Sequence, residues 1–152
     1  MINKGEEQRA HLIMKLRGQG IRSASVLSAI ESVPRDIFIE NALKNHAWEN
    51  VTLPIGEGQT ISQPYIVALM TTALNLSGKE IVLEIGTGSG YQASILSLLC
   101  RRVYTIERIK TLHEFSNKKF KELKLNNITT KFGNGSLGWP EVSPFDRIIL
   151  TC

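Results

Sequence analysis

The feature that most constrains this chain is a short apolar segment that runs into three alternating glycines. Residues 81–85 are apolar except for one glutamate, Gly86, Gly88 and Gly90 follow, and a helical pattern begins at Tyr91. A buried strand, a glycine-rich turn and a helix in this order bring the backbone close to a ligand and direct helix amides toward it. Three glycines in five residues would be a costly way to build a plain turn. The segment therefore indicates a cofactor-binding loop.

The residues after Gly78 alternate between apolar segments and amphipathic segments of helical length. Continuous apolar strands that alternate with helices are typical of a parallel sheet in a doubly wound, Rossmann-like α/β fold. We expect strands at Ile81–Ile85, Val103–Glu107, Ile128–Phe132 and Phe145–Leu150, and helices at Tyr91–Leu99 and Lys110–Leu125.

The first 78 residues are predicted to be mainly helical. A first helix ends at Gly18, a second is N-capped by Ser23 and stops before Pro34, and a third begins at Pro64. Residues 50–64 are rich in Gly, Pro, Thr and Gln, which predicts an ordered loop rather than a regular element. We expect one domain over residues 1–152, with helices and a substrate loop in 1–78 and cofactor-binding βαβ units in 79–152.

The glycine spacing discriminates between cofactors. A dinucleotide loop has the pattern G-x-G-x-x-G, whereas this chain has G-x-G-x-G with Tyr91 in the place of the third dinucleotide glycine. Glu84 directly precedes the loop, and a carboxylate there favours a cationic sulfonium and ammonium over a pyrophosphate. The loop, with Thr87 and Ser89 between its glycines, therefore predicts S-adenosyl-L-methionine. A nicotinamide-dependent oxidoreductase is the alternative.

Glu107 closes the second predicted strand, twenty-one residues beyond Gly86. In this fold a carboxylate at that place can accept hydrogen bonds from both ribose hydroxyls of a nucleoside, a charge-assisted contact. Glu107 alone fits a nicotinamide cofactor equally well, so the choice of S-adenosylmethionine depends on the glycine spacing and on Glu84.

Composition argues against several other classes. The formal net charge of +4 is modest, and five of the lysines fall in residues 110–124 between apolar residues, as on the solvated face of a helix, so we expect no nucleic-acid partner. The two cysteines have no ligand-type neighbours at metal spacing, so no metal site is expected. No apolar run has the length of a membrane span and the N-terminal residues are polar, which predicts a cytoplasmic protein.

Residues 54–65 (PIGEGQTISQPY) closely resemble the signature loop of the protein-L-isoaspartate (D-aspartate) O-methyltransferases. Residues 47–50 (AWEN) before that loop and residues 83–92 (LEIGTGSGYQ) after it are similar to the same family, and the resemblance runs from about Leu12 to the last residue. The Thr60–Pro64 motif is more specific than the glycine loop, which many methyltransferases share. The resemblance implies a class I methyltransferase fold.

The resemblance also implies the reaction, a methyl transfer from S-adenosylmethionine to the α-carboxylate of L-isoaspartyl residues, and of some D-aspartyl residues, in damaged proteins and peptides. The ester then collapses to a succinimide that can hydrolyse to aspartate. By the same resemblance Ser62 is the active-site residue, Gly86, Gly88, Gly90 and Glu107 hold the cofactor, and the turn at Asn134 and Gly135 approaches the adenine. The family usually has Asp where this chain has Asn134, whose oxygen can still accept a hydrogen bond but without charge assistance.

This chemistry requires orientation of the substrate more than it requires a base. A carboxylate with a pKa of about 4 is ionised at neutral pH and needs only to be desolvated and aligned with the methyl group. The hydroxyls of Thr60 and Ser62 can donate hydrogen bonds that orient it. The alternative for Ser62 is a structural one, as the N-cap of the helix that begins near Pro64, although Gln63 could serve equally.

The sequence ends directly after the fourth predicted strand, whereas family members carry further strands that complete the sheet. We therefore expect an unpaired apolar edge at Phe145–Leu150 and self-association through it. Two further alternatives follow. One is a catalytically impaired fragment of the family that binds the cofactor or a partner, and the other is a nucleic-acid methyltransferase, whose polar-Pro-Pro-aromatic motif after the fourth strand is replaced here by Leu150, Thr151 and Cys152.

Overall fold

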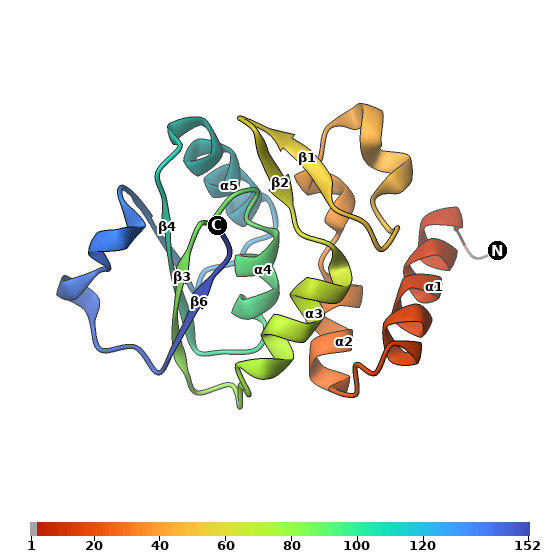
Figure 1. The fold of residues 1–152 in the computed structure, drawn as a ribbon, viewed down its shortest axis with the longest axis horizontal. Coiled ribbons are helices and arrows are strands. Elements are labelled where there is room, and N and C mark those ends of the chain that lie inside the picture. Colours follow the sequence, from red (N-terminus) through yellow and green to blue (C-terminus); the bar gives the residue numbers. More distant parts are fainter. Residues whose placement is uncertain (1–2) are drawn as a thin grey trace.

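A computed structural model describes residues 3–152 of the chain. Figure 1 shows an α-helical N-terminal part packed beside a parallel β-sheet. A β-hairpin lies between these two parts, at the top of this view. The N-terminal helices and the first turns of helix α4 share one apolar core, to which Leu12, Leu16, Ile30, Tyr91 and Ile95 contribute. The two parts therefore share buried contacts, while the expectation of one domain stays a prediction.

The N-terminal helices begin and end where local chemistry predicts. Helix α1 spans Lys4–Gly18, and the side chain of Asn3 accepts a hydrogen bond from the amide of Gly5 at 3.1 Å. Helix α2 spans Ala24–Ser32, and the hydroxyl of Ser23 accepts from the amide of Val26 at 3.3 Å, which confirms the predicted cap. The chain leaves the helical conformation just before Pro34, as expected.

Residues 33–63 contain more regular structure than the sequence predicted. The 3₁₀ helices η1 (Arg35–Phe38) and η2 (Asn41–His46) precede a hairpin of strands β1 (Leu53–Gly56) and β2 (Gln59–Ile61). The prediction that residues 50–64 form an ordered loop without regular elements was therefore wrong, since they contain the hairpin. The strands are only four and three residues long, and the turn between them places Gly56, Glu57 and Gly58 at positive φ, so turn-forming residues dominate the composition.

The large sheet has four parallel strands in the order β5-β4-β3-β6. Helix α3 spans Pro64–Ala73 and leads to the sheet, whose strands and crossover helices lie close to their predicted bounds. These elements are β3 (Ile81–Ile85), α4 (Tyr91–Ser97), β4 (Arg102–Glu107), α5 (Lys110–Glu122), β5 (Ile128–Phe132) and β6 (Arg147–Leu150). Pairing of β3 with both β4 and β6 puts the glycine loop at the centre of the carboxyl edge of the sheet.

Helices α4 and α5 lie on the same face of this sheet (Figure 1), where Val82, Val103 and Ile149 pack against Leu96 and Phe120. Within residues 3–152 the opposite face is only partly covered, by the segment 133–146, which includes the short helices η3 (Gly135–Leu137) and η4 (Pro140–Val142). Edge-to-face contacts of Tyr104 with Trp139 at 5.3 Å and with Phe145 at 5.8 Å hold it there.

Candidate active site

The glycine loop adopts backbone conformations that side chains disfavour. Gly86, Gly88 and Gly90 have φ of 96°, 54° and 93°. A Cβ on Gly86 would lie 2.8 Å from the Cβ of Cys152, and one on Gly90 would lie 2.9 Å from the ring of Phe120. Both positions therefore require glycine for two reasons, the positive φ and the close neighbours. The loop connects β3 to α4 as the sequence predicted.

Glu107 connects the glycine loop to the turn after β4. Its side chain is buried, one carboxylate oxygen accepts from the amide of Gly88 at 2.7 Å, and the other accepts from the amide of Ile109 at 2.9 Å. A carboxylate has about four lone-pair sites, so these two bonds leave acceptor capacity on both oxygens. The position is suited to hold a diol against the loop.

A cavity of 420 Å³ opens beside this carboxylate, within the size range of small-molecule sites of about 300–1,000 Å³. It brings together the carboxyl ends of three strands, the tip of the β1–β2 hairpin and the turn at residues 134–136. Its lining includes Gln59, Thr60, Ile85, Gly86, Gly88, Ile106, Glu107, Ile109, Asn134, Gly135, Leu150 and Thr151. Most of the residues predicted to hold a cofactor therefore meet around one cavity.

A smaller pocket adjoins this cavity and shares Thr60, Gly86, Gly88 and Thr151 with it. Ser62 and Ser89 also line it. The two hydroxyls predicted to face the substrate therefore lie beside the glycine loop, although they come from a different part of the chain. This arrangement can place a substrate group next to a group bound in the larger cavity.

Ser62 is not the cap of helix α3. Gln63 is the N-cap residue but makes no side-chain capping bond; instead the Oδ1 atom of Asn50 accepts from the amide of Tyr65, in the first turn of α3, at 2.9 Å. Ser62 is half-buried, and its carbonyl accepts from the guanidinium of Arg35 at 3.1 Å. The structural alternative for Ser62 is thereby excluded, while its role toward the substrate stays a prediction.

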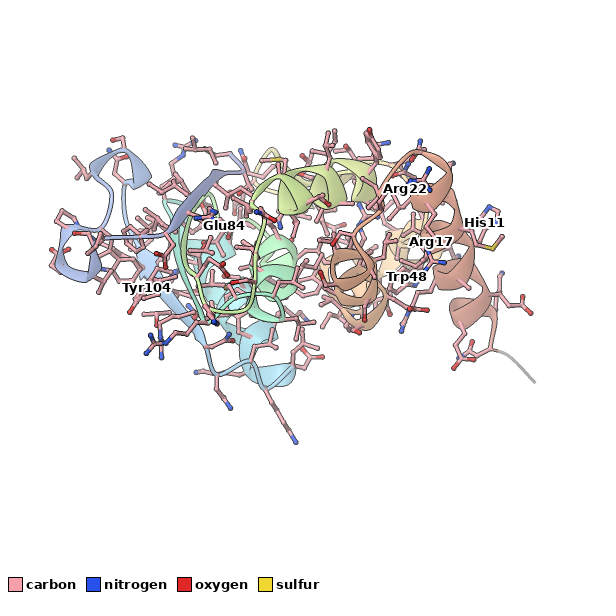
Figure 2. All side chains as sticks on the ribbon, turned by 90° about the horizontal axis from the view of Figure 1, so that it is seen from below. His11, Arg17, Arg22, Trp48, Glu84 and Tyr104 are labelled. Atoms are coloured by element: carbon pink, nitrogen blue, oxygen red, sulfur yellow. The ribbon has the colours of Figure 1, made fainter. Side chains whose placement is uncertain are left out.

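Glu84 lies inside the sheet and not on the cavity wall. Its side chain is fully buried among the strands (Figure 2), and the Thr105 hydroxyl donates to it at 2.7 Å. Burial, and to a smaller extent the nearby charge of Glu107, raises the pKa of Glu84 to about 8, so the carboxyl is mostly protonated at neutral pH. The sequence argument required a carboxylate facing the cofactor, and that direct contact stays a prediction. In the structure Glu84 supports the loop through Thr105, whose hydroxyl lies 2.6 Å from that of Thr87.

The turn after β5 approaches the cavity as expected. The Oδ1 atom of Asn134 accepts from the amide of Ser136 at 3.0 Å and from its hydroxyl at 2.8 Å, so the asparagine caps η3. A Cβ on Gly135 would collide with the Ile85 side chain. Asn134 and Gly135 therefore form a compact wall, and their contact with an adenine stays a prediction.

Sequence reasoning missed Arg35, which reaches Ser62 from the N-terminal part. Its place between Pro34 and Asp36 suggests an exposed charged pair, whereas the side chain is 0% exposed. The weak signal was the apolar context of Val33, Ile37 and Phe38 around it.

A larger hollow of 660 Å³ lies away from the glycine loop, between α1 and residues 48–51. Figure 2 shows its residues His11 and Trp48 at the far end of the molecule from Glu84. Within residues 3–152, no group of three or more His, Cys, Asp or Glu side chains is arranged to hold a metal ion. Among the helices of the same residues, none combines the length and apolarity that crossing a bilayer requires. The 420 Å³ cavity is the candidate active site because the glycine loop and Glu107 line it.

The fold and this site define a class I methyltransferase that uses S-adenosylmethionine. A solved protein-L-isoaspartate O-methyltransferase superimposes with a TM-score of 0.86 at 30% identity, over 94% of this chain and 47% of that one. A putative protein-L-isoaspartate O-methyltransferase from Plasmodium falciparum, solved in complex with S-adenosyl-L-homocysteine, has a TM-score of 0.79 at 24% identity, over 98% of this chain and 73% of its own.

The chain belongs to the protein-L-isoaspartate(D-aspartate) O-methyltransferase family, whose sequence profile matches residues 7–152. A curated protein-L-isoaspartate O-methyltransferase from Parvibaculum lavamentivorans is 55% identical over 150 residues, which are 99% of this chain and 68% of the relative. One from Dictyoglomus thermophilum is 54% identical over 146 residues, 96% of this chain and 66% of the relative. The chain thus spans about two thirds of the length of these relatives. The family expectation is confirmed, and the oxidoreductase alternative has no support.

Proposed function

We propose that this protein transfers a methyl group from S-adenosylmethionine to the carboxylate of L-isoaspartyl residues, and of D-aspartyl residues, in damaged proteins and peptides. The observation that supports the proposal most is the meeting of Thr60 and Ser62 with the glycine loop around adjoining cavities. Family membership supplies the substrate class. The cytoplasmic location expected from the sequence stays a prediction.

The residues of the larger cavity fit the cofactor. Glu107 retains acceptor capacity for two ribose hydroxyls, Gly86 and Gly88 line the cavity, and Asn134 and Gly135 form a wall for a flat ring. Thr87 and Ser89 are buried and hold the loop in shape, since Thr87 contacts Thr105 and the Ser89 hydroxyl accepts from the amide of Tyr91 at 3.2 Å. Bound there, S-adenosylmethionine supplies a methyl group on a cationic sulfur.

The protein's own contribution to the chemistry is placement. A substrate carboxylate is already ionised at neutral pH, so no residue has to remove a proton from it. The hydroxyls of Thr60 and Ser62 donate hydrogen bonds to it and fix its direction beside the loop, and the hairpin that carries Thr60 shields the site from water. Glu84 acts from within the sheet, through Thr105 and Thr87.

Methyl transfer from labelled cofactor to an isoaspartyl peptide, compared with its aspartyl twin, tests the proposal directly. Incorporation into the isoaspartyl peptide alone is expected. Incorporation into neither, with normal cofactor binding, would favour the alternative of a cofactor-binding fragment without transferase activity.

Ser62→Ala tests the role of the hydroxyl. We expect kcat/KM for the isoaspartyl peptide to fall about tenfold, the effect of losing one hydrogen bond to a charged group, while cofactor affinity is unchanged. Ser25→Ala, at an exposed serine of α2, is the matched control. Equal loss of cofactor affinity and turnover would show that Ser62 does not act on the substrate.

A further inference from the structure

We propose that Arg35 is the positioning residue of the substrate side: it holds the backbone at Ser62 against the start of helix α4 and places a buried positive charge behind the site of the substrate carboxylate. This inference rests on the proposed function and names a residue outside both cavities that controls it.

The guanidinium of Arg35 joins backbone segments that are distant in sequence. Nη1 donates to the carbonyls of Ala47 at 2.7 Å and Glu49 at 3.4 Å, and Nη2 donates to those of Val51 at 2.8 Å and Ser62 at 3.1 Å. These acceptors lie twelve to twenty-seven residues away along the chain. A planar fork of donors can hold several carbonyls at once, which a lysine ammonium cannot do in the same geometry. The course of the backbone into Ser62 therefore depends on this one side chain.

The same side chain reaches the cofactor side of the site. The Cζ atom of Arg35 lies 5.8 Å from the centre of the Tyr91 ring, a cation–π distance. Tyr91 is buried, follows Gly90 directly and packs edge-to-face on Phe38 of η1 at 5.6 Å. Because Tyr91 opens helix α4, Arg35 contacts both the substrate turn and the end of the glycine loop. Its loss would alter the distance between the two halves of the site.

The charge of Arg35 has no carboxylate partner. It forms no ion pair with any residue of the described range 3–152, and its hydrogen-bond acceptors are backbone carbonyls. A guanidinium stays protonated in proteins, so the site holds a fully buried cation. Burying an uncompensated charge is costly, and a nearby anion offsets that cost. A substrate carboxylate beside Ser62 would be that anion. A neutral group in the same place would not be attracted by the charge of Arg35.

The test compares Arg35→Lys and Arg35→Met with the same substitutions at Arg22, an exposed arginine at the far end of the molecule from Glu84 (Figure 2). All variants are made in the full chain. Arg35→Lys keeps the charge and loses the fork, so amide hydrogen exchange over residues 47–51 and 60–63 should accelerate about tenfold or more. Binding of S-adenosylhomocysteine by calorimetry should change less than about threefold, because Arg35 does not line its cavity.

Arg35→Met removes the charge as well. Binding of an isoaspartyl peptide to the protein loaded with S-adenosylhomocysteine should weaken about ten- to a hundredfold, the loss expected for a charged partner, and KM should rise with it. Binding of the twin peptide that carries a carboxamide in place of the α-carboxylate should be equal in wild type and variant. The affinity of Arg35→Lys for the charged peptide should lie between the affinities of wild type and Arg35→Met. The Arg22 variants should match wild type throughout.

Each outcome decides the proposal. A purely structural role predicts a lower Tm with unchanged peptide affinity of the folded fraction, or equal losses for charged and neutral peptides, and either result overturns the charge assignment. Unchanged exchange at 60–63 in a folded Arg35→Lys overturns the positioning role. If wild-type protein binds isoaspartyl peptide but transfers no methyl group, the proposed function fails. The exchange and binding measurements still test the positioning role and the charge of Arg35 in that case.

Discussion

At the scale of single residues, the carboxylate of Glu107 holds the glycine loop, and we predict that it also binds the cofactor. Its oxygens accept from the amides of Gly88 and Ile109, and the residue lines the 420 Å³ cavity. The first function is an observation. The second is a prediction that a binding measurement can test.

Glu107→Ala should weaken S-adenosylmethionine binding by about 1.5–3 kcal/mol, or about ten- to a hundredfold in affinity, because a charged acceptor of two hydroxyls is lost. Isothermal calorimetry measures the effect, with Glu114→Ala on the exposed face of α5 as control. Unchanged affinity in a folded Glu107→Ala would contradict the ribose assignment.

Glu84 should make stability depend on pH in the absence of cofactor. Its pKa is about 8 in the folded protein, whereas the ordinary pKa of a glutamate side chain is 4.5. The folded state keeps a proton that the unfolded chain gives up, so the stability that Glu84 contributes is fully present below about pH 4.5 and is lost as pH rises through about 8. Glu84→Gln keeps the shape without the ionisation.

Urea unfolding at about pH 5 and about pH 8.5 tests this, since that interval contains the titration. Wild type should lose more free energy of unfolding across the interval than Glu84→Gln does. Glu114→Gln, at an exposed glutamate, should behave as wild type. Parallel pH profiles for Glu84→Gln and wild type would show that Glu84 does not titrate in this range.

At the scale of elements, the hairpin and the glycine loop complete the site together. Ile55 of β1 lies near Gly88, and the Thr111 hydroxyl of α5 donates to Glu57 at the hairpin turn at 2.7 Å. Composition predicted neither contact, because both join residues far apart in sequence. The strand–loop–helix unit, in contrast, was predicted almost to the residue because its signals are local.

Two of the loop glycines, Gly88 and Gly90, should differ in how well they tolerate alanine. At Gly90 a Cβ would meet Phe120 and Ser116 of α5 at 2.9–3.1 Å with φ at 93°, so Gly90→Ala should cost about 2–4 kcal/mol. At Gly88 the nearest atom is Ile55 Cδ1 at 3.6 Å, and Gly88→Ala should cost about 1 kcal/mol, the left-handed penalty alone. Chemical denaturation of both variants gives the comparison, and equal losses would refute the packing argument.

At the scale of the whole molecule, strand β6 forms one of the two edges of the sheet within the described residues. Ile148 and Leu150 are 58% and 65% exposed on it. Unpaired backbone groups next to exposed apolar side chains favour pairing with a second chain. We predict that residues 1–152 by themselves self-associate as their concentration rises.

Sedimentation velocity over a dilution series measures that association. Ile148→Lys should shift the protein toward monomer, because a charge on the exposed edge opposes pairing. Met14→Lys, on α1 and 71% exposed, is the control for a general gain in solubility. A wild type that stays monomeric throughout the series would rule the edge out as an association site.

The sequence by itself determined the strands and helices of residues 79–152, the glycine loop, the place of Glu107 and the family, because each depends on residues close together in the chain. Only the tertiary structure decided that the side chain of Glu84 is buried inside the sheet, that residues 53–61 form a hairpin, and that Arg35 holds the backbone at Ser62. These features arise from burial and from hydrogen bonds between distant segments. The spacing of residues along the chain does not carry that information, since the same residue type in a similar sequence context can be fully buried, as Arg35 is, or exposed.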